Sequence, residues 1–592
     1  MPGIFGVAPL DGRRPADPAE LNATLDALAA ALRHNSAESV DRHVDASRGL
    51  AIGRIGLAHH HGAAWPSATP MGAAFVSGHP GGLAEGRALS GFYAAAIMDD
   101  DGVTLQADRT GSHRLFWGAW NGRVHFAPEI SALLSLPGAP RDIDFGAFGT
   151  VLASRTLYRD QTLFAGLKRL CGGARLRIGA GAAQVEEYWR YVPGMGRVRK
   201  DSMRDLAMEM ATLLRDSTAR HYGDPASTIL FLSGGKDSRA LLAAALYAKG
   251  ITPEQIRTVT WADSETHGAS DLAIARQLAK ITGVQHEFMV RDQSDFGGKF
   301  ERMNTLLGGG CLMAIDHPSE HEIMERLAAK GIQRSIRGDQ ILTTHGSVFS
   351  IEQAWRSYKI CRLRDASNAI SLLHPQHRSD IVCASEQMFS DLNQRYQDMP
   401  FDAAKDSIYF DVYVQSYLGS SVCWRQLYFD ERSPILDDTI LDFVSETPDE
   451  FRLEKREFDT VMNALWGDRP VVPYATDHGL HYLPDLIAPG GAAEAYVVGQ
   501  IEDGDSGIWA YLDQGEARRL LAGLRAKPRR QSLLKRVLRE ARDTLRRVDP
   551  QLTQNLSTTI KRSTTPPVGL LSSVLILKHW HDHFIAQRPL NR

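Results

Sequence analysis

The octapeptide LSGGKDSR, residues 232–239, combines residue types that could bind and process a phosphate. Residues 227–231 before it are apolar or β-branched and predict a buried strand. Residues 239–250 after it predict a helix closed by Gly250. In a strand–turn–helix unit, backbone N–H groups and the positive end of the helix dipole point at one spot. The stretch therefore predicts an anion-binding loop.

The side chains of this loop indicate how the anion would be held. Gly234 and Gly235 allow the backbone to approach a phosphate closely, and the hydroxyls of Ser233 and Ser238 can donate to its oxygens. Asp237 would repel a phosphate unless a metal ion lay between them, which implies Mg²⁺. A Walker A loop is excluded, because that pattern needs Ser or Thr where the aspartate stands. An ordinary glycine turn is the alternative, and the complete octapeptide in this setting disfavours it.

This loop resembles the SGGxDS loop of the ATP pyrophosphatase superfamily, whose members cleave ATP between the α- and β-phosphates and adenylate a carboxylate or carbonyl. The resemblance implies ATP and Mg²⁺ as cofactors. It also implies that adenine lies between backbone groups at two strand ends, Leu232 and Thr260. We therefore expect the nucleotide to bind along residues 232–238 and at the strand end beside them.

Size and composition set the broad class. A chain of 592 residues is too long for one core and predicts two or three domains. Hydrophobic residues at 43%, charged residues at 23% and a net charge of −3 favour neither nucleic acid nor membrane as a partner. Five scattered cysteines without a CxxC pair indicate free thiols in a reducing compartment. Residues 1–10 lack the features of a signal peptide, so we expect a cytoplasmic protein.

Residues 1–195 alternate short strands and turns after one helix at 19–32. Their order resembles the N-terminal glutaminase domain of the asparagine synthetase family. The resemblance is carried by MPGIFGV at the start, by residues 90–134, and by the closing Tyr188-Trp189. It implies an α+β domain of layered antiparallel sheets with helices, followed by a linker at about 191–200.

The departures from the family pattern concern the chemistry of that domain. The family has its nucleophilic cysteine at the second residue, where this chain has Pro2. The two segments that build the family's glutamine pocket are also altered, at 33–38 and 77–79. Without a thiolate no covalent acyl intermediate forms. We expect a retained scaffold that does not hydrolyse glutamine.

Residues 200–592 predict a second domain. Helices at 203–221 and 271–283 alternate with strands at 256–261 and 284–290, which indicates an α/β parallel sheet covered on both faces. Ligands of such sheets bind at the carboxyl ends of the strands, where the loop would lie. The resemblance implies an ATP pyrophosphatase domain with a helical C-terminal part.

Two further stretches resemble motifs of the same family. IRGDQILTTHG, residues 336–346, is similar to a loop whose aspartate shares Mg²⁺ with the first loop, so Gly338 would contact ATP and Asp339 would be the second metal ligand. The loop is about two residues shorter than the family's and has Gln340 in place of a glutamate. FRLEKREF, residues 451–458, places Lys455 on the family lysine that stabilises developing negative charge.

The histidines and the C-terminal region give weaker signals. The run at 59–61 reads as a turn or strand end rather than a metal site. The alternating histidines at 579–583 fit neither helix nor metal-site spacing, so packing is favoured. Residues 537–548 predict a basic amphipathic helix, either packed on the surface or docking an acidic partner.

The resemblance covers roughly residues 1–460 and implies an ATP-dependent, AMP-forming carbon–nitrogen ligase. Since no internal ammonia supply is expected, the amine should come with the substrate. We predict a lasso peptide macrolactam cyclase, with a processed precursor peptide as substrate and a leader peptidase or recognition protein as a further candidate partner. An ammonia-dependent asparagine synthetase and a β-lactam synthetase-like ligase of small molecules stay open.

Overall fold

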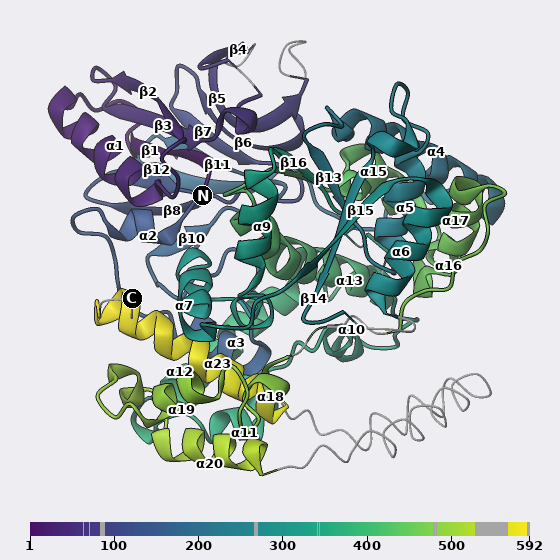
Figure 1. Cartoon of the computed structure of the whole chain (residues 1–592). Helices are drawn as coiled ribbons and strands as arrows, with labels where there is room; N and C mark the ends of the chain where they lie inside the picture. The colour runs from purple at the N-terminus through teal and green to yellow at the C-terminus, as the bar shows by residue number, and fades with distance from the viewer. Residues whose placement is uncertain are drawn as a thin grey trace.

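The computed structural model (Figure 1) describes residues 1–62, 64–69, 72–82, 89–265, 270–339, 341–342, 344–476, 480, 482–526 and 566–588. The expected basic helix at 537–548 and Gln340 lie outside these ranges. Within them, no helix combines the length and the hydropathy that crossing a membrane requires.

The first part of the chain forms two layered six-stranded antiparallel sheets, as predicted. One has the order β10-β8-β9-β1-β3-β2 and the other β12-β11-β7-β6-β5-β4. The strands are β1 Gly3–Pro9, β2 Ser39–Asp45, β3 Leu50–Gly56, β4 Ser67–Thr69, β5 Gly72–Gly81, β6 Ser90–Met98, β7 Val103–Ala107, β8 Phe116–Trp120, β9 Arg123–Ala127, β10 Leu167–Arg169, β11 Ala174–Gly179 and β12 Ala182–Glu187.

A shared apolar core and one predicted helix hold these sheets in place. Ile4 of β1 and Phe75 of β5 belong to one buried cluster, which joins the two sheets. Helix α1, Pro18–Leu32, buries leucines at helical spacing and packs on β1 and β3. Two further helices, α2 Ile130–Leu134 and α3 Phe145–Ser154, complete this part.

The second part is built on a five-stranded parallel sheet of order β15-β14-β13-β16-β17. Its strands are β13 Thr228–Phe231, β14 Arg257–Ala262, β15 Gln285–Val290, β16 Arg334–Ile336 and β17 Asp430–Arg432. Alternate residues of β13 enter different cores: Ile229 joins the cluster of α7 and α9, whereas Leu230 joins that of α4, α5 and α6. Both faces of the sheet are therefore covered, as predicted.

Helices make up most of what remains (Figure 1). Around the sheet lie α4 Met203–Tyr222, α5 Lys236–Ala245, α6 Asp271–Thr282, α7 Phe296–Leu306, α8 Met313–Asp316, α9 Glu320–Ala329, α15 Asp438–Glu446, α16 Asp449–Arg452 and α17 Phe458–Trp466. The others are α10 Ile351–Ser357, α11 Ser367–Ile370, α12 Pro375–Gln394, α13 Phe401–Ile408, a π-helix Tyr409–Leu418, α14 Gly419–Arg425, α18 Leu483–Leu486, α19 Glu494–Glu502, α20 Gln514–Arg525 and α23 Pro567–Trp580.

The helix after the predicted phosphate loop does not have the expected bounds. It runs over Lys236–Ala245 instead of 239–250. Gly235 is its N-cap, so the helix begins directly after the turn. Tyr247 and Ala248 then donate to carbonyls only three residues back, and Gly250 has a left-handed φ of 81°. Gly250 therefore closes the turns that follow the helix rather than the helix itself.

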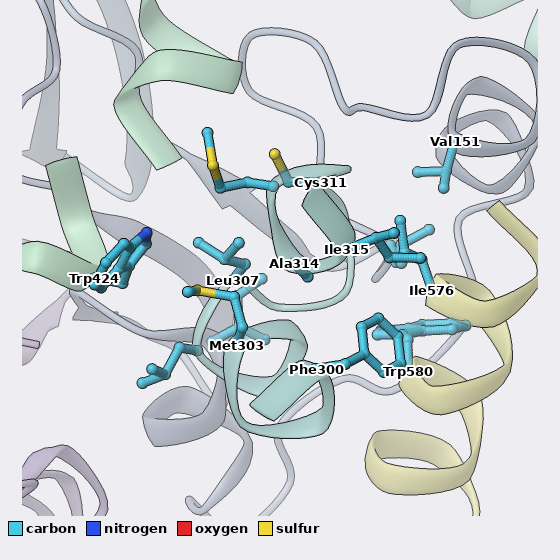
Figure 2. Packing of buried hydrophobic residues seen from close by; sticks show 14 of the residues in the cluster. Val151, Phe300, Met303, Leu307, Cys311, Ala314, Ile315, Trp424, Ile576 and Trp580 are labelled. Carbon is cyan, nitrogen blue, oxygen red and sulfur yellow. The ribbon is translucent and has the colours of Figure 1, made fainter. Parts of the chain in front are cut away.

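The C-terminal helix α23 packs between distant segments. Figure 2 shows Ile576 and Trp580 of α23 near Phe300 of α7, with Val151 of α3 in the same cluster. His579 also contacts α7, since its Nδ1 lies 2.9 Å from the side-chain Nδ2 of Asn304. The prediction that this region is a packing element is confirmed. The expectation that the histidine spacing does not fit a helix is wrong, because His579 lies in α23 and His581 and His583 lie in the π-helix His581–Ile585. Likewise, His60 ends a 3₁₀ turn, as expected for the histidine run.

Candidate active site

The predicted phosphate loop lies at the carboxyl end of β13. The amide of Leu232 donates to the carbonyl of Val259 at 2.9 Å, and the hydroxyl of Thr260 donates to the carbonyl of Leu232. These bonds bring the two strand ends together. Both Leu232 and Thr260 are buried, so backbone atoms rather than mobile side chains form this edge of the site.

Within the loop, the two serines hold each other. The Oγ atoms of Ser233 and Ser238 lie 2.9 Å apart, and the amide of Ser233 donates to Ser238 Oγ at 3.1 Å. Ser233 Oγ also accepts from the amide of Gly235 at 3.2 Å. The hydroxyls therefore fix the turn, and they lie at the start of α5 where the helix dipole favours an anion.

Residue 234 must be glycine because neighbouring residues pack too closely against it to leave room for a side chain. A Cβ built there would lie 2.4 Å from the Cβ of Ala475 and 3.0 Å from that of Ile274. Its amide donates to Asp271 Oδ1 at 2.7 Å, and its carbonyl accepts from the amide of Ala475 at 3.1 Å. The loop is thus pressed between α6 and the segment 472–475, which we call the cover segment.

The cover segment is held down by an arginine of the loop helix. Arg239 donates to the carbonyls of Pro473 at 2.8 Å and Gly234 at 3.2 Å, and its guanidinium carbon lies 4.4 Å from the Tyr474 ring. Arg239 is almost fully buried. The last residue of the octapeptide therefore fastens the cover segment to the turn.

Asp237 and Lys455 form a direct ion pair. Lys455 Nζ donates to both carboxylate oxygens of Asp237, at 2.8 and 2.7 Å, and only 4% of the lysine is exposed. Burial raises the pKa of Asp237, the Lys455 ammonium offsets part of that rise, and the carboxylate of Asp339 adds to it. The structure thus joins residues that lie more than two hundred positions apart.

The backbone that carries Lys455 is strained. Glu454 and Lys455 both have left-handed φ values, 55° and 52°, in a short 3₁₀ segment. Two consecutive non-glycine residues in this region are costly, and such strain persists where the surroundings enforce it. Here Lys455 belongs to the strained turn and makes the ion pair with Asp237, so this pairing helps to hold the turn.

The second loop meets the first at Gly338. A Cβ there would lie 2.6 Å from the amide nitrogen of Ser238 and 2.7 Å from the carbonyl carbon of Asp237. Asp339 follows, 4% exposed, with an oxygen 2.6 Å from Nη2 of Arg337. Glycine at 338 therefore lets the two loops touch and brings the two predicted metal-binding carboxylates into one site.

The residues present fit a magnesium ion bound together with a nucleotide. Asp237 and Asp339 influence each other electrostatically, and both are mostly buried. Two such carboxylates repel one another unless a cation lies between them. Mg²⁺ in nucleotide sites takes one or two carboxylates from the protein and the remaining oxygens from phosphates and water. The predicted set of ligands is consistent with that chemistry.

Two family models match the chain in the regions described above. A glutamine amidotransferase domain model matches residues 78–189, and an asparagine synthase model matches residues 209–340, which contain both loops. Together they give the domain pair in the predicted order. The two matched regions cover less than half of the chain and resemble the corresponding domains of the asparagine synthetase family.

Curated relatives of the asparagine synthetase family match only part of the chain. Proteins of Mycobacterium bovis and Mycobacterium tuberculosis, named as glutamine-hydrolysing asparagine synthetases, are 28% identical over 280 residues. That match covers 45% of this chain and 42% of each relative. Asparagine synthetase 3 of Bacillus subtilis is 27% identical over 162 residues, 26% of this chain and 26% of its own. The chain thus spans less than half the length of these relatives.

Among solved structures, a glutamine phosphoribosylpyrophosphate amidotransferase of Bacillus subtilis aligns with 60% of this chain and 89% of its own. The identity is 13% and the TM-score 0.22. A score that low carries no argument about this chain.

In the first domain, the residues at the altered family positions make contacts of their own. Pro2 is buried at the start of β1. Glu38 accepts from the backbone amides of His34 and Asn35, at 2.9 and 3.0 Å, and His34 Nε2 lies 2.7 Å from Glu129. The altered segment 33–38 therefore satisfies its own polar groups.

The sequence patterns did not identify three residues that surround the predicted phosphate loop. Asp271 accepts from the Gly234 amide, Arg337 pairs with Asp339, and Arg239 fastens the cover segment. Asp271 looked like a common acidic residue in the first turn of a helix, and Arg337 like a neighbour of the motif. An arginine inside the octapeptide was the one available signal for the cover segment, because a buried guanidinium needs acceptors.

Proposed function

We propose that this protein is an ATP-dependent ligase that forms an amide bond and releases AMP and pyrophosphate. The observation that supports it best is the joining of Asp237, Asp339 and Lys455 beside the serine–glycine loop. Three charged groups from three segments, buried together at the carboxyl end of a parallel sheet, match the requirements of nucleotide activation. The match of residues 209–340 to an asparagine synthase model supports the same reaction.

In this proposal each group has one task. The substrate carboxylate attacks the α-phosphorus of ATP, so that an acyl-adenylate forms and pyrophosphate leaves. The backbone amides at the start of α5, residues 236–238, bind the departing pyrophosphate, beside the turn that the two serine hydroxyls hold. Mg²⁺, when bound, would be held by Asp237 and Asp339 and would neutralise phosphate charge. Lys455 stabilises the negative charge that develops as the reaction proceeds.

We further propose that the nucleophile is an amine of the same substrate, as in macrolactam formation by a lasso peptide cyclase. The support is the contrast between the two domains: the ATP site keeps its charged groups, whereas position 2 holds a proline and no thiol. An enzyme without its own ammonia source needs an amine already held beside the acyl-adenylate. Tethered nucleophiles reach effective concentrations of roughly 10⁵ M or more, so an intramolecular amine meets that need.

The test is incubation of the protein with ATP, Mg²⁺ and a candidate core peptide that has a free N-terminus and an Asp or Glu side chain. We expect AMP, pyrophosphate and a cyclic product lighter than the linear peptide by one water. ADP and phosphate as products would contradict the proposed class of ligase.

A second candidate is an asparagine synthetase, since the relatives are named as glutamine-hydrolysing asparagine synthetases. With Pro2 in place of a cysteine, such an enzyme would have to use free ammonia. It would share the ATP site and differ only in the substrates. Free aspartate with ammonium is therefore run beside the peptide. Formation of asparagine without any cyclised peptide would replace the macrolactam proposal with this one.

A further inference from the structure

A cavity of about 340 Å³ lies beside the candidate active site and has no role in the account above. Its walls come from the end of α3, from α8, from the π-helix and from the start of α23. Four tyrosines line it: Tyr358, Tyr413, Tyr417 and Tyr482. Asp316 is the only acidic residue among the described residues of its lining.

A row of stacked tyrosines runs from this cavity along the π-helix. The rings of Tyr409 and Tyr413 are 5.3 Å apart, and those of Tyr413 and Tyr417 are 5.2 Å apart. The spacing of four residues keeps all three on one face of the π-helix Tyr409–Leu418, a type of helix that is frequent at functional sites. Tyr417 then donates to Asp316 Oδ2 at 3.3 Å.

Burial and nearby charges raise the pKa of the tyrosines in this row. Burial raises the pKa of Tyr409, and the charges of Tyr413 and Asp237 add to the rise. Burial likewise raises the pKa of Tyr413, with further contributions from Asp339 and then Asp316.

Tyr358, which lines the cavity, supplies the contact with the site. Its ring lies 4.9 Å from that of His345, and the carbonyl of His345 accepts from the amide of Glu454, the neighbour of Lys455, at 3.3 Å. The cavity therefore lies one residue away from the turn that carries Lys455.

Asp316 and the tyrosine rings can attract an alkylammonium group, whereas Arg155 and Lys359 in the same lining repel it and favour the neutral amine. A carboxylate pairs with the charge, and aromatic faces attract cations. Burial raises the pKa of Asp316, and the nearby charges of His317, Arg155 and Lys359 oppose that rise. Arg155 and Lys359 also line the cavity, so the acid lies among cations at its edge and tyrosines in its wall.

We propose that Asp316 binds the attacking amine of the substrate in this cavity and accepts its proton. This rests on the ligase activity proposed above. The ammonium transfers one proton to Asp316, and the nitrogen lone pair then forms a bond to the acyl carbon. The bond from that carbon to the AMP oxygen breaks, and AMP leaves with the electron pair. The second proton of the nitrogen passes to solvent.

The experiment separates activation from amide formation. Exchange of labelled pyrophosphate into ATP, dependent on the core peptide, measures acyl-adenylate formation, and mass spectrometry measures the cyclic product. In Asp316→Asn we expect exchange within about twofold of the wild type and cyclic product reduced on the order of 100-fold. Asp316→Glu should recover part of the product, because it keeps the carboxylate.

Controls distinguish the role of Asp316 from general damage. Asp380→Asn, an exposed change on α12, should leave both readouts unchanged. A core peptide with an acetylated N-terminus should support exchange equally in wild type and Asp316→Asn, since it has no amine to bind. If Asp316→Asn unfolds, Tyr417→Phe gives a second reading, with a smaller loss confined to the product.

The outcomes are distinct. Normal product formation in Asp316→Asn, or an equal loss of exchange and product in the folded variant, would overturn the role of Asp316 alone. Absence of peptide-dependent exchange in the wild type would overturn the proposed function and this inference with it.

Discussion

The region around Pro2 in the first domain and the predicted phosphate loop around Asp237 in the second differ in the groups that they bring together. Around Pro2 the strand is buried and paired in its sheet, but residue 2 carries no thiol, and Glu38 accepts from the backbone amides of His34 and Asn35. Around Asp237 the charged side chains persist and pair across three segments. Apolar burial alone preserves a fold, whereas buried charges are costly compared with apolar residues of similar size. The buried charges around Asp237 are therefore consistent with the proposed chemistry at that loop.

The strongest way to break this contrast is to remove a carboxylate of the ATP site. Asp237→Asn and Asp339→Asn should each reduce pyrophosphate release to background, because each loses a predicted metal ligand. Release is measured with purified protein, ATP, Mg²⁺ and substrate. Asp398→Asn, an exposed change, is the matched control. Full activity in either site variant would remove that residue from the metal site.

The next effect concerns the buried lysine. Lys455→Ala should lower kcat on the order of 10²-fold and leave ATP affinity nearly unchanged, because Lys455 acts on charge that develops during the reaction. Steady-state kinetics and nucleotide titration measure the two quantities. Arg456→Ala changes an adjacent exposed cation and should have little effect. A kcat close to normal in the lysine variant would leave Lys455 a structural partner of Asp237.

Contact between the two loops can be tested at a single backbone position. Gly338→Ala should cost about 1–3 kcal/mol of stability and reduce activity, because its Cβ would overlap the backbone of Asp237 and Ser238. Thermal melting and pyrophosphate release report both effects. Gly499→Ala, in helix α19 where no atom lies within 4 Å of the added Cβ, should be neutral or stabilising. Equal behaviour of the two variants would mean that the loops do not need this contact.

Both domains should lose stability in acid through buried histidines. Burial lowers the pKa of His125 to about 4, and that of His113, His321 and His579 to about 3. The unfolded chain binds these protons below about pH 6.5, whereas the folded protein does so only near pH 3–4. Unfolding free energy should therefore fall as pH drops from 6.5 towards 4.

Buried carboxyls oppose this trend. Burial raises the pKa of Asp438 to about 6, so its contribution favours the folded state as pH falls through that range. Burial also raises the pKa of further carboxyls, namely Asp108, Asp237, Asp316, Asp406 and Glu431. Among the described residues, histidines with a lowered pKa outnumber these carboxyls, so we expect a net loss of stability in acid. Denaturant unfolding at pH 7.5, 6 and 5 measures the slope, and His113→Gln should flatten it. Stability that is constant across this range would contradict the buried neutral histidines.

The smallest expected effect concerns the first domain, which should not hydrolyse glutamine. Glutamine incubated with the protein, with and without ATP, should yield no glutamate above background, because position 2 holds no thiol. An active glutamine-hydrolysing relative serves as the positive control. Release that survives further purification would require another nucleophile and would end the contrast between the two pockets.

The sequence alone determined the local elements and their order. The apolar run at 227–231, the leucine spacing of α1 and the alternation of strands and helices predict the sheets and helices correctly, because they depend on short-range periodicity. The sequence also named both carboxylates, since each stands in a motif. The bounds of α5 were missed, because the N-cap at Gly235 is set by the turn and not by the apolar pattern.

Only the tertiary structure decided which groups meet. The pairing of Lys455 with Asp237, the contact of Gly338 with Ser238 and the cover segment over Gly234 all join residues that are distant in the chain. The hydrogen bond from Tyr417 of the π-helix to Asp316 of α8 likewise forms only when these helices pack together. Such contacts depend on close packing and on the pairing of buried charges, which no local pattern of residues encodes.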